Sequence, residues 1–126
     1  MAALIARSNL ALIQGIYYLL TAAFPIVSMR AYEEVFGRQE SHWLVKTHGL
    51  MDGAIGLVLA WAGLRKSASP EIPVLGMAAA LGLAVPESYY VASRRISAAY
   101  LLDILPQLAF AGLWGWLLSR SAVGRR

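Results

Sequence analysis

Cysteine is absent from this sequence and charged residues are scarce. Without cysteine, the chain forms no disulfide, no thiolate metal site and no thiol-based active site. Asp, Glu, Lys and Arg make up 14% of the 126 residues, whereas about 25% is usual in soluble domains. Hydrophobic residues make up 59%, which is more apolar surface than a soluble domain of this length can bury. The composition therefore predicts a protein that lies in a lipid bilayer.

Apolar runs of membrane-crossing length fill most of the chain. A helix needs about 20 apolar residues to cross a bilayer. Such runs occupy residues 9–29, 44–64, 72–92 and 96–119. We therefore expect a single transmembrane domain over residues 1–126, an all-α, polytopic integral membrane four-helix bundle with antiparallel neighbours. We expect the first run to be retained, because it is too long for a signal peptide and no convincing cleavage site follows it.

The connections between these runs carry their own signals. Residues 31–36 are amphipathic and precede Gly37, which predicts a short interfacial helix between the first and second crossings. Ser69 as a cap and Pro70 at the first helical position predict the start of the third crossing. The short connection over residues 93–97 predicts an antiparallel hairpin of the third and fourth crossings.

Basic residues are scattered over the helix ends, where they ordinarily meet lipid headgroups. No basic face with interleaved aromatics exists, so we expect no nucleic-acid partner. An even number of crossings puts both termini on one side. That side carries Arg7, Arg65, Lys66, Arg120, Arg125 and Arg126, and the other side carries Arg30, Arg38, Lys46, Arg94 and Arg95. The excess of one basic residue favours cytoplasmic termini.

Small residues form a stripe along the second crossing. Gly49, Gly53, Gly56, Ala60 and Gly63 follow one another at steps of four and three. Such a stripe lets another helix backbone approach closely, so it predicts a packing seam. Either a helix of the same chain or a second copy in a homo-oligomer can use this seam, and both alternatives stay open.

Four acidic or imidazole side chains lie inside the apolar runs. His48 and Asp52 are one helical turn apart in the second run, Glu87 lies in the third and Asp103 in the fourth. At about 1.5 Å per residue from the non-terminal side, the three carboxyl groups lie roughly 9 to 12 Å deep and His48 about 6 Å deep. A charged group facing lipid costs a few kcal/mol. We therefore expect these groups to line a polar cavity that occupies one half of the bundle.

Further polar residues lie on helix faces that can turn toward this layer. Gln14, Tyr18 and Thr21 are spaced by four and three residues, which places them on one face of the first helix. The predicted ligand-binding residues are Gln14, Tyr18, Thr21, Tyr90, Tyr100 and Gln107. Polar residues in membrane helices also serve simply to tie helices together, and this alternative stays open.

The ionisable residues can exchange protons near neutral pH, which suits general acid-base chemistry. We take His48, Asp52, Glu87 and Asp103 as catalytic candidates for isomerisation, cyclisation or hydrolysis of a small lipophilic molecule. Proton-coupled export of a small cation is an alternative. A third reading is a structural or accessory subunit, in which Arg94 or Arg95 pairs with a carboxylate and nothing is bound. Polarity in only one half of the bundle favours a one-sided pocket over a transport path.

Metal binding receives little support from the sequence. The ionisable set is rich in oxygen ligands, but His48 and Asp52 lack the second histidine of a zinc protease motif. We therefore expect no metal and no cofactor. The expected partners are the lipid bilayer and the small lipophilic molecule.

Several short runs carry a family resemblance. They are Gln14-Gly-Ile-Tyr-Tyr with Pro25 in the first helix, the capping segment 32–37, Trp43-Leu-Val-Lys before the second helix, and residues 94–103 opening the fourth. Their order resembles small four-helix bacterial membrane proteins that are broadly similar to the DoxX-like group. Some DoxX-like proteins are associated with respiratory or sulfur redox systems. The resemblance implies the helical arrangement and a location in the bacterial inner (cytoplasmic) membrane. This chain has no cysteine and no evident haem-binding pair, so the resemblance carries over no active site.

Overall fold

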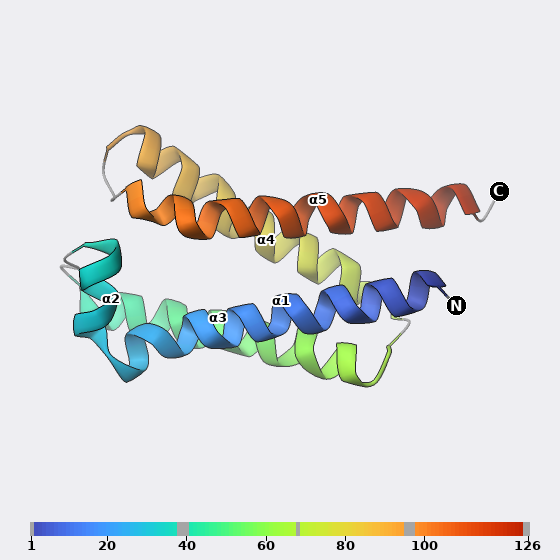
Figure 1. Ribbon diagram of the computed structural model, residues 1–126, viewed down its shortest axis with the longest axis horizontal. Coiled ribbons are helices and arrows are strands. Elements are labelled where there is room, and N and C mark those ends of the chain that lie inside the picture. Colours follow the sequence, from blue (N-terminus) through green and yellow to red (C-terminus); the bar gives the residue numbers. More distant parts are fainter. Residues whose placement is uncertain (1, 38–40, 68, 95–97, 125–126) are drawn as a thin grey trace.

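The computed structural model describes residues 2–37, 41–67, 69–94 and 98–124 (Figure 1). In these ranges the regular elements are all helices, as the sequence predicts. They are α1 (Ala2–Val27), α2 (Met29–Phe36), α3 (His42–Leu64), α4 (Glu71–Ala92), the 3₁₀ helix η1 (Ala98–Tyr100) and α5 (Leu101–Gly124). The predictions for Arg38, Arg95, Arg125 and Arg126, and for the hairpin turn beyond Arg94, fall outside the described residues.

Most helix boundaries differ from the predicted ones by a few residues. α1 begins before residue 9, because the residues ahead of it also favour a helix and no breaker separates them. α4 begins at Glu71, one residue before the predicted apolar run, and Pro70, the predicted first helical position, is instead the residue that precedes the helix. The Ser69 hydroxyl donates a hydrogen bond to the Glu71 carboxylate. The Ser69 side chain therefore does not cap the backbone N–H groups at the start of α4. The signals near Ser69 therefore locate the start of the helix to within a residue.

Among the described residues, three helical segments are long and apolar enough to cross a membrane. They are Ile5–Val27, Glu71–Ala92 and Ala98–Arg120. α3, the predicted second crossing, is not among them. It is 23 residues long, but it carries His48, Asp52 and several glycines, and these lower its mean hydropathy.

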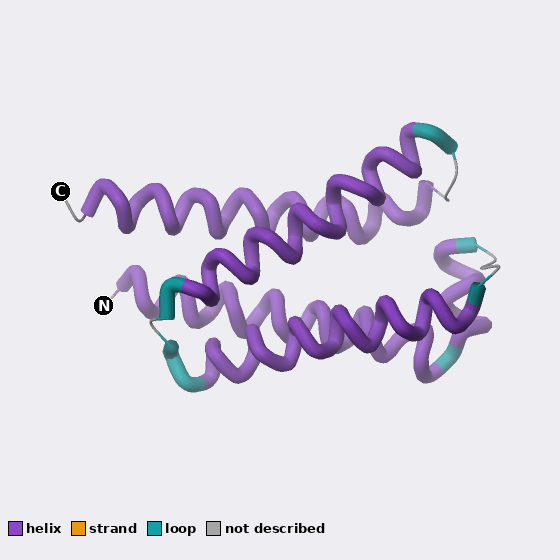
Figure 2. Tube along the Cα trace, turned by 180° about the vertical axis from the view of Figure 1, so that it is seen from behind, coloured by secondary structure: helices purple, strands orange, loops and turns teal. Residues whose placement is uncertain are grey.

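The helices form two antiparallel pairs, α1 with α3 and α4 with α5 (Figure 1). Seen from behind, α4 runs obliquely across the molecule in front of α5 (Figure 2). Both chain ends lie at one end of the bundle, and α2 lies at the other end, on the side of the connection between α4 and α5 (Figure 1). This is the arrangement expected of an even number of antiparallel long helices.

The glycine stripe of α3 packs against α1 of the same chain. A Cβ atom added to Gly15 would lie 2.6 Å from the carbonyl oxygen of Gly56, and one added to Gly63 would lie 2.7 Å from the backbone nitrogen of Leu12. Such contacts require that the two backbones touch, which is what a small-residue stripe permits. The predicted seam is therefore occupied within the chain, and α1 covers the surface that a second copy would need.

α2 closes one end of the bundle as a short amphipathic helix. It begins two residues before the predicted start, because the Ser28 Oγ accepts a hydrogen bond of 3.2 Å from the Ala31 N–H. It ends at Phe36, and Gly37 follows with a φ of 94°, a left-handed value that favours glycine. The rings of Tyr32 and Phe36 pack on each other with centroids 4.9 Å apart.

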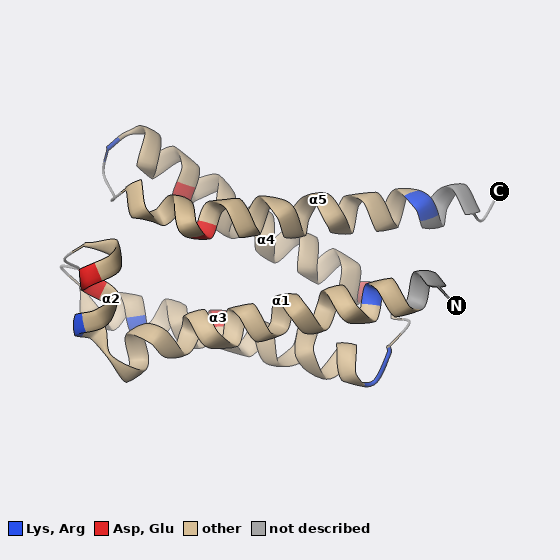
Figure 3. Ribbon diagram, viewed as in Figure 1, with Lys and Arg blue, Asp and Glu red and all other residues tan. Residues whose placement is uncertain are grey.

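The outer surface of the bundle is apolar, whereas polar side chains lie inside it. Leu20 on α1, Leu57 on α3 and Leu105 on α5 are 67%, 62% and 66% exposed. Gln14 and Gln107, in contrast, are completely buried. Lys and Arg lie toward the ends of the bundle (Figure 3). A continuous apolar exterior of this kind marks a surface that is covered by lipid or by another protein.

Candidate functional site

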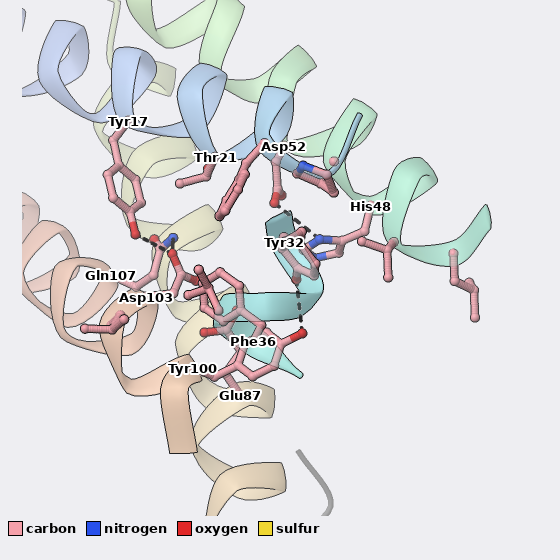
Figure 4. Close-up of a pocket in the computed structure, with 17 residues that line it drawn as sticks. Tyr17, Thr21, Tyr32, Phe36, His48, Asp52, Glu87, Tyr100, Asp103 and Gln107 are labelled. Carbon is pink, nitrogen blue, oxygen red and sulfur yellow. Dashed lines mark hydrogen bonds and ion pairs between the residues drawn. The ribbon is translucent and has the colours of Figure 1, made fainter. Parts of the chain in front are cut away.

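A cavity of about 540 Å³ lies in the half of the bundle that α2 covers. Every described helix contributes to its wall, α4 through Glu87 and η1 through Tyr100. The polar residues of the lining are Tyr17, Thr21, Tyr32, His48, Asp52, Glu87, Tyr100, Asp103 and Gln107 (Figure 4). The apolar residues are Phe24, Pro25, Val35, Phe36, Leu44, Val45, Gly49 and Leu102. The cavity therefore combines an aromatic and aliphatic wall with several ionisable groups.

The four catalytic candidates all lie in this lining, as their common depth in the sequence predicts. His48 Nδ1 and Asp52 Oδ2 are 3.3 Å apart and form an ion pair when the imidazole is protonated. Asp103 is close enough to both Asp52 and Glu87 for the carboxyl groups to interact electrostatically. Figure 4 shows His48 and Asp52 on one wall and Asp103 on the facing wall. The geometry brings these residues together, and their roles in catalysis stay predictions.

Asp103 has the best-defined surroundings of the acidic groups. The Tyr17 hydroxyl donates a hydrogen bond of 2.5 Å to Asp103 Oδ1. Gln107 lies one turn further along α5 and donates from Nε2 to the same oxygen at 3.4 Å. Two donors on one oxygen, from α1 and from α5 itself, fix the position of this carboxyl group at the cavity wall.

A chain of buried hydrogen bonds continues from Gln107 into the core. The Tyr18 hydroxyl donates to Gln107 Oε1 at 2.6 Å. Gln14 Nε2 donates to the Tyr18 hydroxyl at 3.2 Å and to the carbonyl of Gly76 at 3.0 Å. Trp114 Nε1 donates to Gln14 Oε1 at 2.6 Å. These bonds join α1, α4 and α5 beneath the cavity.

Three of the predicted ligand-binding residues do not lie in the cavity lining. Gln14 and Tyr18 are 0% and 1% exposed, because the buried chain of hydrogen bonds uses their polar atoms. Tyr90 is 40% exposed and packs edge-on against Tyr89 with ring centroids 5.3 Å apart. It comes three residues after Glu87, which turns it about 60° around the helix. Gln14 and Tyr18 therefore form hydrogen bonds between helices, which is the alternative role that the sequence left open.

The other predicted ligand-binding residues, Thr21, Tyr100 and Gln107, lie in the lining. Tyr17 and Tyr32 also line the cavity and were not among the predicted site residues. Tyr17 is four residues before Thr21, so the two share a helix face, and this spacing is the signal that identifies Tyr17. Tyr32 had no such signal, because its position depends on how α2 folds back over the bundle.

Aromatic rings from α1, α2 and η1 form the outer wall of the cavity. The ring centroids of Phe24 and Tyr32 are 5.7 Å apart, and those of Phe36 and Tyr100 are 4.8 Å apart. The hydroxyl oxygens of Tyr32 and Tyr100 are joined by a hydrogen bond of 3.0 Å. Burial raises the pKa of the Tyr32 phenol, and the hydrogen bond with Tyr100 raises it further, so this phenol stays neutral.

The alternative of internal neutralisation by arginine receives no support from the described residues. Within them, Arg94 forms no ion pair with Glu87 or Asp103, and Arg95 lies outside the described ranges. One oxygen of Glu87, Oε2, is buried and has no hydrogen-bond partner in the described part of the chain. A buried carboxyl oxygen without a donor is unusual in a folded protein.

No group of three or more His, Cys, Asp or Glu side chains is arranged to hold a metal ion in the part of the chain that the structure describes.

Comparisons of the chain with models of known protein families, with curated proteins and with solved structures find no match. The resemblance to DoxX-like proteins therefore stays an expectation from the sequence.

Proposed function

We propose that this chain is a four-crossing protein of the bacterial inner membrane, with cytoplasmic termini and a DoxX-like arrangement of helices. α3 crosses the membrane beside the three more apolar segments, because it lies against α1 along the glycine seam. Its 23 residues reach about 35 Å at 1.5 Å per residue, enough to cross a hydrocarbon core of about 30 Å. Its outward side chains Leu50, Leu57 and Leu64 are exposed and apolar, whereas His48 and Asp52 line the cavity.

The cavity is the proposed binding site for a small lipophilic molecule that carries a polar group. The observation that carries this proposal is the lining itself, in which aromatic and aliphatic side chains surround a few converging polar groups. Ligand sites have volumes of about 300 to 1,000 Å³ and are mostly apolar with a few polar groups that orient the ligand. The cavity's volume of about 540 Å³ lies in that range.

General acid-base conversion of the bound molecule is the reaction that these side chains suit. In this scheme the His48 and Asp52 pair accepts a proton from the ligand, and a protonated Glu87 carboxyl group donates one. The two walls of the cavity would then act on opposite sides of the molecule. Isomerisation, cyclisation and hydrolysis all require such a pair of groups.

The closed inner end of the cavity supports a one-sided pocket over a transport path. Gln14, Tyr18 and Trp114 lie next to the cavity toward the terminal end of the bundle, and each is at most 1% exposed. Their hydrogen bonds are made with one another and with Gln107 and Gly76. A transported molecule would have to break this set of contacts to pass.

Blocking the cavity tests the proposal. Val45→Trp places a large side chain in the lining, and Val58→Trp makes the same change at a position of α3 that is 43% exposed. We expect unmodified protein purified from membranes to retain a lipophilic molecule that mass spectrometry of an organic extract detects. Val58→Trp should retain it, and Val45→Trp should lose it. Equal retention by both variants would place the molecule on the outer surface and would reject the cavity as its site.

A further inference from the structure

The lining of the cavity contains more acidic than basic side chains. Its lining contains the carboxyl groups of Asp52, Glu87 and Asp103, and His48 is the basic side chain among the described lining residues. His48 is paired with Asp52 at 3.3 Å, so the two groups neutralise each other when both are charged. Glu87 and Asp103 then face the cavity without a basic partner. Because charges away from bulk water are weakly screened, this excess of acidic groups favours a cation and opposes an anion.

The hydrogen bonds around Asp103 all point in one direction. From Trp114 to Gln14, from Gln14 to Tyr18, from Tyr18 to Gln107 and from Gln107 to Asp103, each residue donates to the next. Tyr17 donates to the same carboxyl oxygen from the other side. Asp103 is the final acceptor, so these donors fix its carboxyl group at the cavity wall. The buried residues of this chain are positioning residues that aim an acidic side chain into the cavity.

Glu87 provides an independent sign that the cavity lacks a hydrogen-bond donor. Its Oε2 is buried and has no hydrogen-bond partner among the described residues, although Glu87 lines the cavity. A ligand N–H group would satisfy this oxygen. An alcohol can also donate to it, but an alcohol adds no positive charge.

The aromatic wall completes the surroundings that a cation prefers. The rings of Phe24, Tyr32, Phe36 and Tyr100 contact one another in sequence, with centroids 4.8 to 5.7 Å apart. Figure 4 shows Tyr32, Phe36 and Tyr100 beside the walls that carry the carboxyl groups. The faces of aromatic rings attract cations, and groups of such rings recognise ammonium ligands.

We propose that the ligand of this cavity is a lipophilic organic cation, an alkyl or arylalkyl ammonium compound, with Asp103 as its counter-ion and the aromatic rings around its apolar body. This inference rests on the proposed function, because it names the chemical class of the molecule that the cavity binds. It assigns the positive charge to the ligand, since the described lining holds no lysine or arginine to neutralise Glu87 and Asp103.

Four probes with the same apolar body and different charges test the inference. They are 4-phenylbutylamine, its N,N,N-trimethylated form, the neutral 4-phenylbutan-1-ol and the anion 4-phenylbutanoate. Binding is measured by isothermal titration calorimetry with the full chain in nanodiscs of zwitterionic phosphatidylcholine, and the heat from empty nanodiscs is subtracted. We expect both cations to bind at least tenfold more tightly than the alcohol, and the carboxylate to bind most weakly.

Variants then identify the counter-ion. Asp103→Asn should weaken binding of 4-phenylbutylamine about tenfold and leave binding of the alcohol unchanged. Glu34→Gln removes a carboxylate from α2 whose side chain is 70% exposed and outside the lining, and it should change neither affinity. If Asp103→Asn does not fold, Glu87→Gln replaces it, with the same expected direction, and the charge series on the unmodified protein needs no variant.

The outcomes separate the inference from the proposed function. If the alcohol binds as tightly as the amines and Val45→Trp abolishes its binding, the cavity is a ligand site but its ligand is not a cation, and this inference is overturned. If none of the probes binds and no molecule is retained on purification, the proposed function fails as well. Loss of amine binding in both Asp103→Asn and Glu34→Gln would show a response to net charge and would also overturn the assignment of Asp103.

Discussion

Replacing Gln14 with leucine tests whether the buried hydrogen bonds hold the helices together. The Gln14 side chain joins α1 to α4 through the Gly76 carbonyl and to α5 through Trp114, and it also donates to Tyr18. Leucine has a similar size and removes all three bonds. Because Gln14 is 0% exposed, no lipid or water can replace the lost partners.

The expected loss of stability follows from what each partner retains. The Gly76 carbonyl keeps its place in the helix, and the Tyr18 hydroxyl still donates to Gln107, so these two bonds cost about 0.6 kcal/mol each, the average for interhelical bonds in a membrane protein. The Trp114 N–H loses its acceptor and stays buried, which costs about 1 to 3 kcal/mol. We therefore expect Gln14→Leu to lower the free energy of unfolding by about 2 to 4 kcal/mol.

The measurement is reversible unfolding in mixed micelles, followed by far-ultraviolet circular dichroism. Asn9→Leu is the matched control, because Asn9 is an amide on the same helix with an exposed side chain, and it should change stability by less than about 0.5 kcal/mol. A double-mutant cycle with Trp114→Phe isolates the bond between Gln14 and Trp114. Additive effects of the two substitutions, or a loss below about 0.5 kcal/mol for Gln14→Leu, would refute the reasoning.

Three further predictions concern packing, topology and ionisation. Gly15→Ala should destabilise the chain by more than about 2 kcal/mol, because its Cβ would clash with the backbone of α3, whereas Gly112→Ala has nothing within 4 Å and should be neutral or mildly stabilising in the same unfolding assay. Because the chain has no cysteine, single cysteines at Ser67 and Glu34 should react with a membrane-impermeant maleimide from opposite sides of the bacterial membrane, and labelling of both from one side would contradict the proposed crossings. Burial raises the pKa of Tyr32 in the folded chain above the unfolded value of about 10. The stability that Tyr32 contributes is therefore present below pH 10 and lost as the pH rises above 10. Tyr32→Phe should reduce this alkaline loss of stability, and an unchanged stability profile between pH 9 and 12 would contradict this prediction.

The sequence predicts the helices and the layer of ionisable residues well, because both depend on local rules. Apolar runs of membrane length and the signals at Gly37 and Pro70 locate α1 to α5 to within a few residues, except at the outer ends of α1 and α5. The common depth of Asp52, Glu87 and Asp103 follows from the rise per residue and requires only antiparallel neighbours.

The orientation of polar residues within each helix is harder to predict. Gln14, Tyr18 and Thr21 share one face in the sequence pattern, yet only Thr21 reaches the cavity. The reason is that Gln14 and Tyr18 form hydrogen bonds with α4 and α5, and periodicity contains no information on which neighbour a helix face will meet. Tyr32 shows the same limit, since its place in the wall depends on the turn at Ser28.

Two kinds of contact explain why a cavity exists between these helices at all. The glycine seam holds α1 and α3 in backbone contact along their length, which leaves no space between them. The α4 and α5 pair is joined to α1 at the level of Gln14 by side-chain hydrogen bonds with Gly76 and Trp114. From Gln14 the hydrogen bonds continue through Tyr18 and Gln107 to Asp103. The same hydrogen bonds therefore close the inner end of the cavity and position its central carboxyl group. A change in this chain of bonds should then affect ligand affinity and stability together, whereas a change in the glycine seam should affect stability first.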